Sequence, residues 1–201
     1  LFVGDSNGNI WFYRNSGDSL APAFTFVSSQ YHNISAAAPF ATPAFHDVDA
    51  DGDLDLFIGA INGQLTFYRN IGSSDSAIFE FVTDSYFDVR GIGKLTPTFA
   101  DIDLDGDADL FIGDSDGVVA QYTNIGTADS ADYVAEQDPT ILLFARAEVD
   151  PSFTDYDQDG DLDIILGLTR PTGGAIEYYR NDGDATSPDF SAMPDSIENV
   201  S

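Results

Sequence analysis

One stretch of nine residues occurs three times in this chain, and it constrains the fold more than any other feature. Each copy has aspartate at its first, third, fifth, seventh and ninth positions and glycine at its sixth, and the copies begin at Asp47, Asp101 and Asp155. Successive copies are 54 residues apart. Self-similarity at a fixed period of this length is the signature of proteins assembled from equivalent structural units. The sequence therefore predicts a tandem repeat architecture.

The spacing of the aspartates predicts a calcium loop. Five carboxylates within nine residues repel one another unless a cation lies among them. The pattern Asp-x-Asp-x-Asp-Gly wraps oxygen ligands around Ca²⁺, with the glycine at the sharp turn. The helix-flanked form of this loop ends on a glutamate at position twelve, which is Ile58, Ile112 or Leu166 here. We therefore expect the ninth aspartate to close the ligand shell, in a loop between two β-strands.

Three structural Ca²⁺ sites are predicted, one in each aspartate loop (residues 47–55, 101–109 and 155–163). The alternative is a solvated acidic turn, but such a turn requires neither the glycine nor the alternate spacing. The first, third, fifth and ninth aspartates are expected to bind through their carboxylates and the seventh through its backbone carbonyl. The predicted ligands are Asp47, Asp49, Asp51, Asp53, Asp55, Asp101, Asp103, Asp105, Asp107, Asp109, Asp155, Asp157, Asp159, Asp161 and Asp163.

The repeat extends beyond the loops on both sides. A Pro-x-Phe segment precedes each loop, and a short apolar segment that ends in glycine follows it, with residues 1–4 as a fourth copy of that segment. A turn with Asn-Gly, Asp-Gly or Gly-Gly comes next, as in tight β-hairpins. An aromatic segment that ends in Asn-x-Gly then follows. A last short strand is expected at residues 24–27, 79–82 and 132–134.

Each unit thus contains four short antiparallel strands, and four-stranded units in tandem are typical of a β-propeller. We expect an all-β fold: a single β-propeller segment over residues 1–201, with about four blades, the first incomplete, and calcium loops between strands one and two. The aromatic residues are expected to pack between blades rather than to line a ligand site. Residues 140–147 are the one segment where we allow a helical turn. The repeat units are expected at about 1–38 (partial), 39–92, 93–146 and 147–201.

Charge and composition exclude several classes of partner and chemistry. The chain has 35 Asp plus Glu against seven Lys plus Arg, a formal net charge of −28, so we expect no nucleic-acid binding. No run approaches the ~18 apolar residues of a bilayer span, so we expect no membrane insertion. His46 is replaced by Ala100 and Thr154 in the other repeats, and His32 lies alone in a variable connection. Because the clustered carboxylates are assigned to the loops, no enzymatic activity is predicted.

With these residues in view, the chain resembles the FG-GAP/VCBS repeat family, whose blades also form the head of integrin α-subunits. The Tyr-Arg-Asn-x-Gly segment resembles the VCBS type of bacterial and archaeal surface proteins. The resemblance implies a calcium-stabilised propeller that works outside the cell or on its surface. Family propellers have seven or eight blades, so it also implies that a longer chain or self-association supplies the remaining blades. The matching residues are Phe45, Asp47, Asp49, Asp51, Gly52, Asp55, Ile58 and Gly59, with their equivalents 54 and 108 residues later, and the segments at Tyr13, Tyr68 and Tyr179.

The expected function is a non-enzymatic, extracellular, calcium-binding propeller module for protein recognition, adhesion, or surface or filament assembly. One alternative is a lectin-like propeller that binds carbohydrate through aromatics such as Trp11 or Tyr31. Another is an accessory domain of a secreted polysaccharide-degrading enzyme. We expect the protein or glycan ligand on the rim opposite the calcium loops, because divergent loops on a fixed scaffold are where recognition resides. The divergent connections there are residues 28–39, 84–96 and 135–150.

Overall fold

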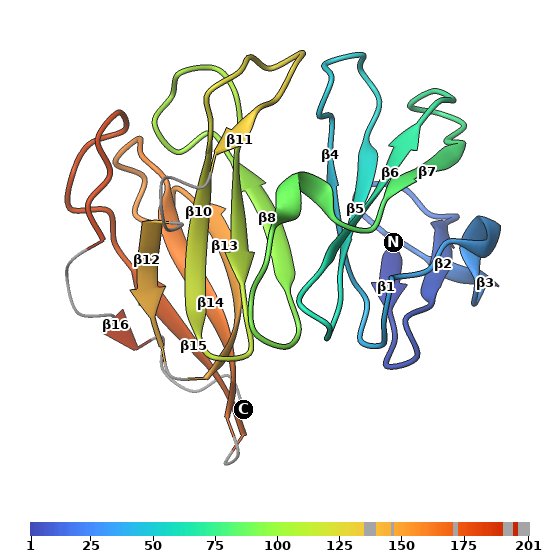
Figure 1. Ribbon diagram of the computed structural model, residues 1–201, viewed down its shortest axis with the longest axis horizontal. Helices are drawn as coiled ribbons and strands as arrows, with labels where there is room; N and C mark the ends of the chain where they lie inside the picture. Colours follow the sequence, from blue (N-terminus) through green and yellow to red (C-terminus); the bar gives the residue numbers. More distant parts are fainter. Residues whose placement is uncertain (135–139, 146, 171–172, 191–194, 197–201) are drawn as a thin grey trace. The chain divides into compact units, whose positions relative to one another are not determined.

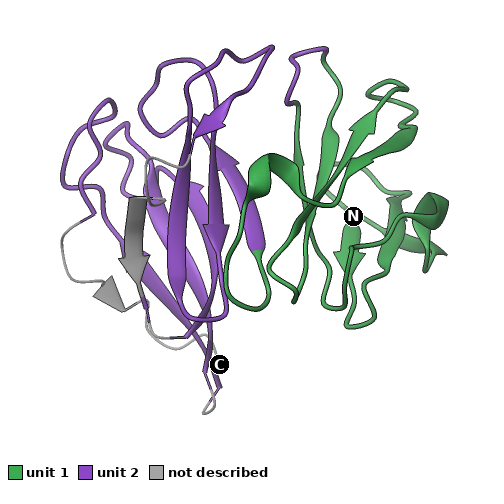
Figure 2. Ribbon diagram, in the orientation of Figure 1, with its two compact units in different colours: residues 1–47, 52–95 green, residues 48–51, 96–201 purple. Residues whose placement is uncertain are grey.

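The chain folds into antiparallel β-sheets, each built on a meander of strands in sequence order, to which the third sheet adds one further strand (Figure 1). The computed structural model describes residues 1–134, 140–145, 147–170, 173–190 and 195–196. In these residues, all named strands fall into four sheets, which confirms the predicted all-β class. The described part contains no helix with the length and apolarity needed to span a membrane. Contacts between Cα atoms divide the chain into one unit of residues 1–47 and 52–95 and another of residues 48–51 and 96–201 (Figure 2).

The first unit contains a three-stranded and a four-stranded sheet. The three-stranded sheet lacks the strand that precedes an aspartate loop in the other sheets, as expected for the incomplete first repeat. A single turn of 3-10 helix follows the last strand of each sheet: η1 (Tyr31–Asn33) and η2 (Tyr86–Asp88). The strands are β1 (Phe2–Gly4), β2 (Ile10–Asn15) and β3 (Phe24–Ser28), then β4 (Thr42–His46), β5 (Asp55–Gly59), β6 (Leu65–Asn70) and β7 (Phe79–Thr83).

The second unit contains the other two sheets. The third sheet has the order β11-β10-β9-β8, and a further strand, β12, pairs with β10 beside β11. The fourth sheet has the order β13-β14-β15-β16. The strands are β8 (Thr96–Ala100), β9 (Asp109–Gly113), β10 (Val118–Asn124), β11 (Tyr133–Val134) and β12 (Thr140–Phe144), then β13 (Glu148–Thr154), β14 (Asp163–Arg170), β15 (Gly173–Tyr179) and β16 (Asp195–Ser196).

The expectation of a helical turn at residues 140–147 is wrong for residues 140–144. Residues 140–144 form β12, which pairs antiparallel with β10 in a register that joins Val118 to Phe144 and Gln121 to Thr140. A short apolar run does not distinguish a buried helix from a strand by periodicity. Here β11 is only two residues long, so most of β10 has an open edge that the following segment can occupy. Residue 146 lies outside the described residues.

Apolar central strands and aromatic pairs form the cores. All five residues of β5 and of β9 are buried. The Phe57 ring stacks on Phe67 at a centroid distance of 4.7 Å, and Tyr86 of η2 meets the Phe57 ring edge-on at 5.1 Å. Such pairs stabilise beyond the area that they bury. These three aromatic residues therefore pack in the core and do not line a ligand site.

A glycine ends the apolar segment after each aspartate loop, and another segment of the chain passes close to the first two of these glycines. A Cβ on Gly59 would collide with the carbonyl oxygen of Leu95, and one on Gly113 would lie 2.5 Å from the carbonyl oxygen of Val149. At the equivalent position in the fourth sheet, the nearest atom to a Cβ on Gly167, among the described residues other than its chain neighbours, is Cβ of Asp150 at 3.6 Å. Gly59 and Gly113 therefore permit the close approach of these backbone segments.

Candidate metal centre

Each aspartate loop joins the first strand of a sheet to the second and brings three carboxylates together. In every loop, one carboxylate oxygen of the first, third and fifth aspartates lies within 4.8 Å of the other two. Two oxygens bound to one Ca²⁺ at roughly 2.3–2.6 Å can be at most about 5 Å apart. The observed spacing is therefore compatible with one shared cation in each loop. The three groups are Asp47, Asp49 and Asp51; Asp101, Asp103 and Asp105; and Asp155, Asp157 and Asp159.

Two backbone reversals produce this convergence. The fourth residue of each loop has a φ of 53–66°, and the glycine at the sixth position has a φ of 92–102°. The amide of that glycine donates a hydrogen bond to Oδ2 of the first aspartate, over 2.9 Å in the first loop and 3.2 Å in the other two. Apart from the two chain neighbours, no atom of the described residues lies within 4 Å of a Cβ built on these glycines. The requirement for glycine here is thus conformational rather than steric.

Several buried carboxylate oxygens indicate whether the loops are suited to hold a cation. Within the described chain, the Oδ1 atoms of Asp101, Asp107 and Asp161 are buried and accept no hydrogen bond. Burial, together with neighbouring carboxylates, raises the pKa of Asp107 and of Asp161. Buried anionic oxygens of this kind are costly unless a cation or a donor satisfies them. The donors are all oxygen atoms, which is the set that Ca²⁺ prefers, so the residues fit a calcium ion.

The ninth aspartate of each loop is buried at the start of the second strand. Its exposed fraction is 1% at Asp55, 3% at Asp109 and 0% at Asp163. In each case Oδ1 accepts a hydrogen bond of 2.7–2.9 Å from the backbone amide of an asparagine in the aromatic segment. Burial raises the pKa of Asp109 to about 6, although the hydrogen bonds from Asn124 and Gln121 oppose the shift. The ninth aspartate is not among the three convergent groups, so its role in closing the ligand shell stays a prediction.

The asparagine extends the network from the aspartate loop to the loop after the aromatic segment. Its side-chain oxygen accepts hydrogen bonds from backbone amides two and eight residues further along, as Asn70 does from Gly72 and Ile78 over 3.1 and 2.9 Å. Sequence reasoning noted the Asn-x-Gly motif but assigned it no role. Its recurrence at 15 residues after the ninth aspartate in the first two loops was the available signal. The four asparagines are Asn15, Asn70, Asn124 and Asn181.

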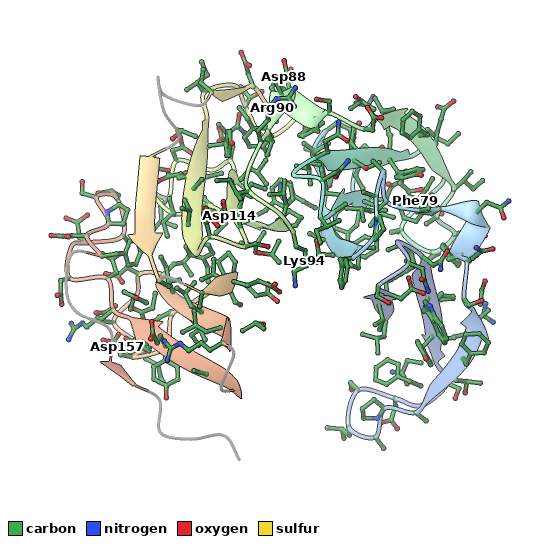
Figure 3. The ribbon with its side chains drawn as sticks, turned by 60° about the horizontal axis from the view of Figure 1, so that its bottom comes forward. Phe79, Asp88, Arg90, Lys94, Asp114 and Asp157 are labelled. Carbon is green, nitrogen blue, oxygen red and sulfur yellow. The ribbon has the colours of Figure 1, made fainter. Side chains whose placement is uncertain are left out.

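The third loop has a basic side chain among its carboxylates. Arg180 lies 3.2 Å through Nε from Oδ2 of Asp157, which Figure 3 labels, and 3.3 Å through Nη2 from Oδ2 of Asp159. The Asp157 carboxylate contributes most to the raised pKa of the guanidinium. At the matching place in the repeat, after the tyrosine of the aromatic segment, the second loop has Thr123. The second and third loops therefore differ at this neighbouring position although their aspartates follow the same pattern.

The two histidines have the contacts of packing side chains. Burial lowers the pKa of His46 at the end of β4, although the charge of Asp47 opposes the shift. The His32 ring stacks on Tyr31 at a centroid distance of 4.2 Å and an interplanar angle of 10°. Neither arrangement indicates a catalytic role. The absence of enzymatic activity stays a prediction.

Comparison with protein families gives one finding. A family model described as FG-GAP-like repeat matches residues 47–112 and again residues 101–166, which together exceed half of the chain. Each match begins at the first aspartate of one loop and ends in the strand after the next loop. Searches of curated proteins and of solved structures found no match.

Proposed function

Because this chain belongs to the family of FG-GAP-like repeats, β-propeller-like modules that are often extracellular, we propose that it is a non-enzymatic, Ca²⁺-binding β-propeller segment that recognises or assembles with partners outside the cell. The observation that carries the proposal is the convergence of three carboxylates in each of three loops, at the same place in three successive sheets. One ion in each loop makes three sites.

The chain's own residues define what an ion does in these loops. Ca²⁺ supplies two positive charges where the aspartates converge. The left-handed residues and the glycine amide hold the first carboxylate in place before an ion arrives. The ninth aspartate and the asparagine connect that end of the sheet to the neighbouring loop. The ions are therefore structural: they offset carboxylate repulsion and hold the first two strands in register.

The recognition surface is proposed on the connections between sheets, at the sheet end opposite the aspartate loops. In the first unit, Phe40 on the connection before β4 is 45% exposed, and Ile61 in the adjoining β5–β6 turn is 44% exposed. The amide of Ile61 donates to the carbonyl of Pro39 over 3.0 Å. Arg90 and Asp88, 3.7 Å apart, lie side by side on the connection after β7 (Figure 3). Exposed apolar side chains and polar, charged residues both occur at protein-binding surfaces, the charged ones mainly at the rim.

Backbone strain also favours the connections as the functional surface. Phe40 and Phe87 have φ values of 63° and 46°, in the left-handed region that bulky residues rarely adopt. Strain of this kind costs about 1–3 kcal/mol and concentrates at functional sites. A sequence selected for stability alone has no reason to keep phenylalanine at these two positions. Their side chains therefore support a role in binding.

A protein partner is better supported than a glycan. The indole N–H of Trp11 donates to Oδ2 of Asp5 over 2.9 Å, so its polar edge is already engaged. Tyr31 packs against Phe2 and Phe12, with ring centroids 5.2 and 4.7 Å away. Both aromatics proposed for a lectin-like site thus have structural contacts.

Calcium titration combined with thermal melting tests the proposal. Isothermal titration calorimetry of the EDTA-treated and dialysed chain is expected to show three Ca²⁺ per chain. An ion present at 100 times its dissociation constant stabilises by about 2.7 kcal/mol, so three ions correspond to a melting temperature roughly 20 °C higher than in EDTA. Mg²⁺ at the same concentration is the control, and it should restore little because it requires a tighter octahedron. An unchanged melt in EDTA together with no binding heat contradicts the proposal.

A further inference from the structure

The third aspartate loop differs from the second in the charge of one neighbouring side chain. Arg180 directly follows β15 and reaches back to two carboxylates of the convergent group, Asp157 at 3.2 Å and Asp159 at 3.3 Å. The same residue of the repeat beside the second loop is Thr123, which carries no charge. All of these residues belong to the second unit.

We propose that Arg180 is a resident counter-ion of the third loop, which competes with Ca²⁺ for Asp157 and Asp159 and makes this loop a weaker calcium site than the second. The inference rests on the proposed calcium function. It ranks two of the three sites: the second loop fills before the third, which fills only when Ca²⁺ is plentiful. The family pattern alone, which is the same in both loops, predicts no such difference.

The guanidinium satisfies only the outer part of the third loop. The Arg180 side chain is 52% exposed, and the two carboxylates that it meets are 29% and 34% exposed. Asp161 is only 9% exposed, and its buried Oδ1 accepts no hydrogen bond even with Arg180 in place. A planar guanidinium on the outside therefore leaves the interior oxygen unsatisfied. This buried oxygen is a second observation, independent of the acidic cluster, that indicates a smaller cation deeper in the loop.

Two physical effects make Arg180 weaken calcium binding. An ion that binds Asp157 and Asp159 must first break or loosen their pairs with the guanidinium, and an exposed pair of this kind is worth up to about a factor of five in an equilibrium constant. A guanidinium that stays nearby also repels the bound ion, because both are cations a few ångströms apart. Together the effects predict that the third site binds Ca²⁺ roughly tenfold more weakly than it would with a neutral residue at position 180.

The counter-ion has the opposite effect when calcium is absent. Arg180 offsets carboxylate repulsion in the ion-free loop, so the third loop keeps part of its stability without Ca²⁺. The second loop, with Thr123, has no arginine at this position. Replacement of Arg180 by a neutral residue should therefore widen the difference in melting temperature between the calcium-loaded and the calcium-free protein. Loss of packing contacts alone does not predict this widening.

The test uses the whole chain with Arg180→Thr, which copies the residue found beside the second loop. The matched control is Arg14→Thr, at the same strand position in the first sheet, where no aspartate loop precedes it in the chain. Calcium affinities are measured by isothermal titration calorimetry, and melting temperatures in excess Ca²⁺ and in EDTA. The double variant Arg180→Thr with Asp157→Asn assigns the affected site, because it disables the third loop.

The expected result is that Arg180→Thr tightens one of the calcium sites about tenfold and that the double variant loses this tight site. Arg180→Thr should also raise the melting temperature in Ca²⁺ and lower it in EDTA, whereas a merely structural arginine would lower both. Titration and melting curves that match those of Arg14→Thr, with calcium binding intact in the wild type, overturn the role of Arg180 alone. A wild-type chain that binds no Ca²⁺ overturns the proposed function as well.

Discussion

The two ends of each sheet differ in how closely they repeat from one sheet to the next. At the aspartate-loop end, three sheets repeat the same arrangement: a left-handed fourth residue, a glycine amide on the first aspartate, and a buried ninth aspartate on an asparagine amide. At the other end, the connections contain a 3-10 turn after the first two sheets and the strand β12 after the third. Identical chemistry at one end thus coexists with dissimilar structure at the other.

The aspartate-loop ends thus form a scaffold that the sheets share, and the connections give each sheet its own structure. Networks of buried hydrogen bonds define one arrangement and tolerate little change, because removal of any member leaves a buried group unsatisfied. The connections are held by apolar packing, as Tyr86 is against Phe57 and Phe67, and packing of this kind can be satisfied by several backbone paths. The aspartate-loop end is therefore expected to respond strongly to substitution and the connection end mostly weakly.

The largest effect is expected at Asp109, where the predicted ligand and the network meet. Asp109→Asn should lower the free energy of unfolding by roughly 4 kcal/mol in excess Ca²⁺, because it removes a buried charge from a paired network. In EDTA the loss should nearly disappear, since burial without a cation already disfavours this carboxylate and raises its pKa to about 6. Urea denaturation in both buffers measures the two values, with Asp132→Asn on the exposed loop as control. Equal losses in Ca²⁺ and in EDTA would show that Asp109 acts without the ion.

A large effect is also expected at Gly113, although it lies at the connection end. This residue is an exception to the weak response expected of that end. Gly113→Ala places a Cβ 2.5 Å from the carbonyl oxygen of Val149 and 2.7 Å from Cδ of Pro151, so the backbone must shift. We expect a loss of about 3 kcal/mol, at the upper end for overpacked sites. Gly167→Ala is the matched control, because its nearest neighbour is at 3.6 Å, and it should change stability by less than about 1 kcal/mol. Similar losses in the two variants would mean that close approach is not the reason for the glycine.

A smaller effect is expected from the asparagine that continues the network. Asn124→Ala removes the acceptor for the amides of Gly126 and Asp132, both at 3.0 Å, and should cost about 2 kcal/mol. Asn15 makes the same two bonds in the first sheet, but it is exposed, so water can replace its oxygen in Asn15→Ala. That control should lose about 1 kcal/mol or less. Thermal or urea denaturation of the two variants separates a buried network from an exposed turn, and equal losses would contradict the distinction.

The same contrast explains how much the sequence could predict. The aspartate loops, the antiparallel strands and the hairpin turns were predictable because each depends on local residue types at fixed spacing. Strand β12 was not, because Ile141 to Phe144 is uniformly apolar and its strand partner, β10, is chosen by tertiary pairing. Arg180 was visible as a repeated residue, but its contact with the third loop depends on how the strand end approaches that loop. Local chemistry was predictable from sequence, whereas long-range pairing was not.

The smallest change in stability is expected at Phe40, and it tests whether this side chain is dispensable for the fold, as the proposed recognition surface requires. Phe40→Asn loses about 1 kcal/mol of partial burial but relieves roughly as much backbone strain, since asparagine accepts a φ of 63° more readily. The free energy of unfolding should therefore change by less than about 0.5 kcal/mol in urea denaturation. A protein under selection for stability alone has no reason to keep phenylalanine at such a site. A loss above 2 kcal/mol would instead make Phe40 a core residue and remove it from the proposed recognition surface.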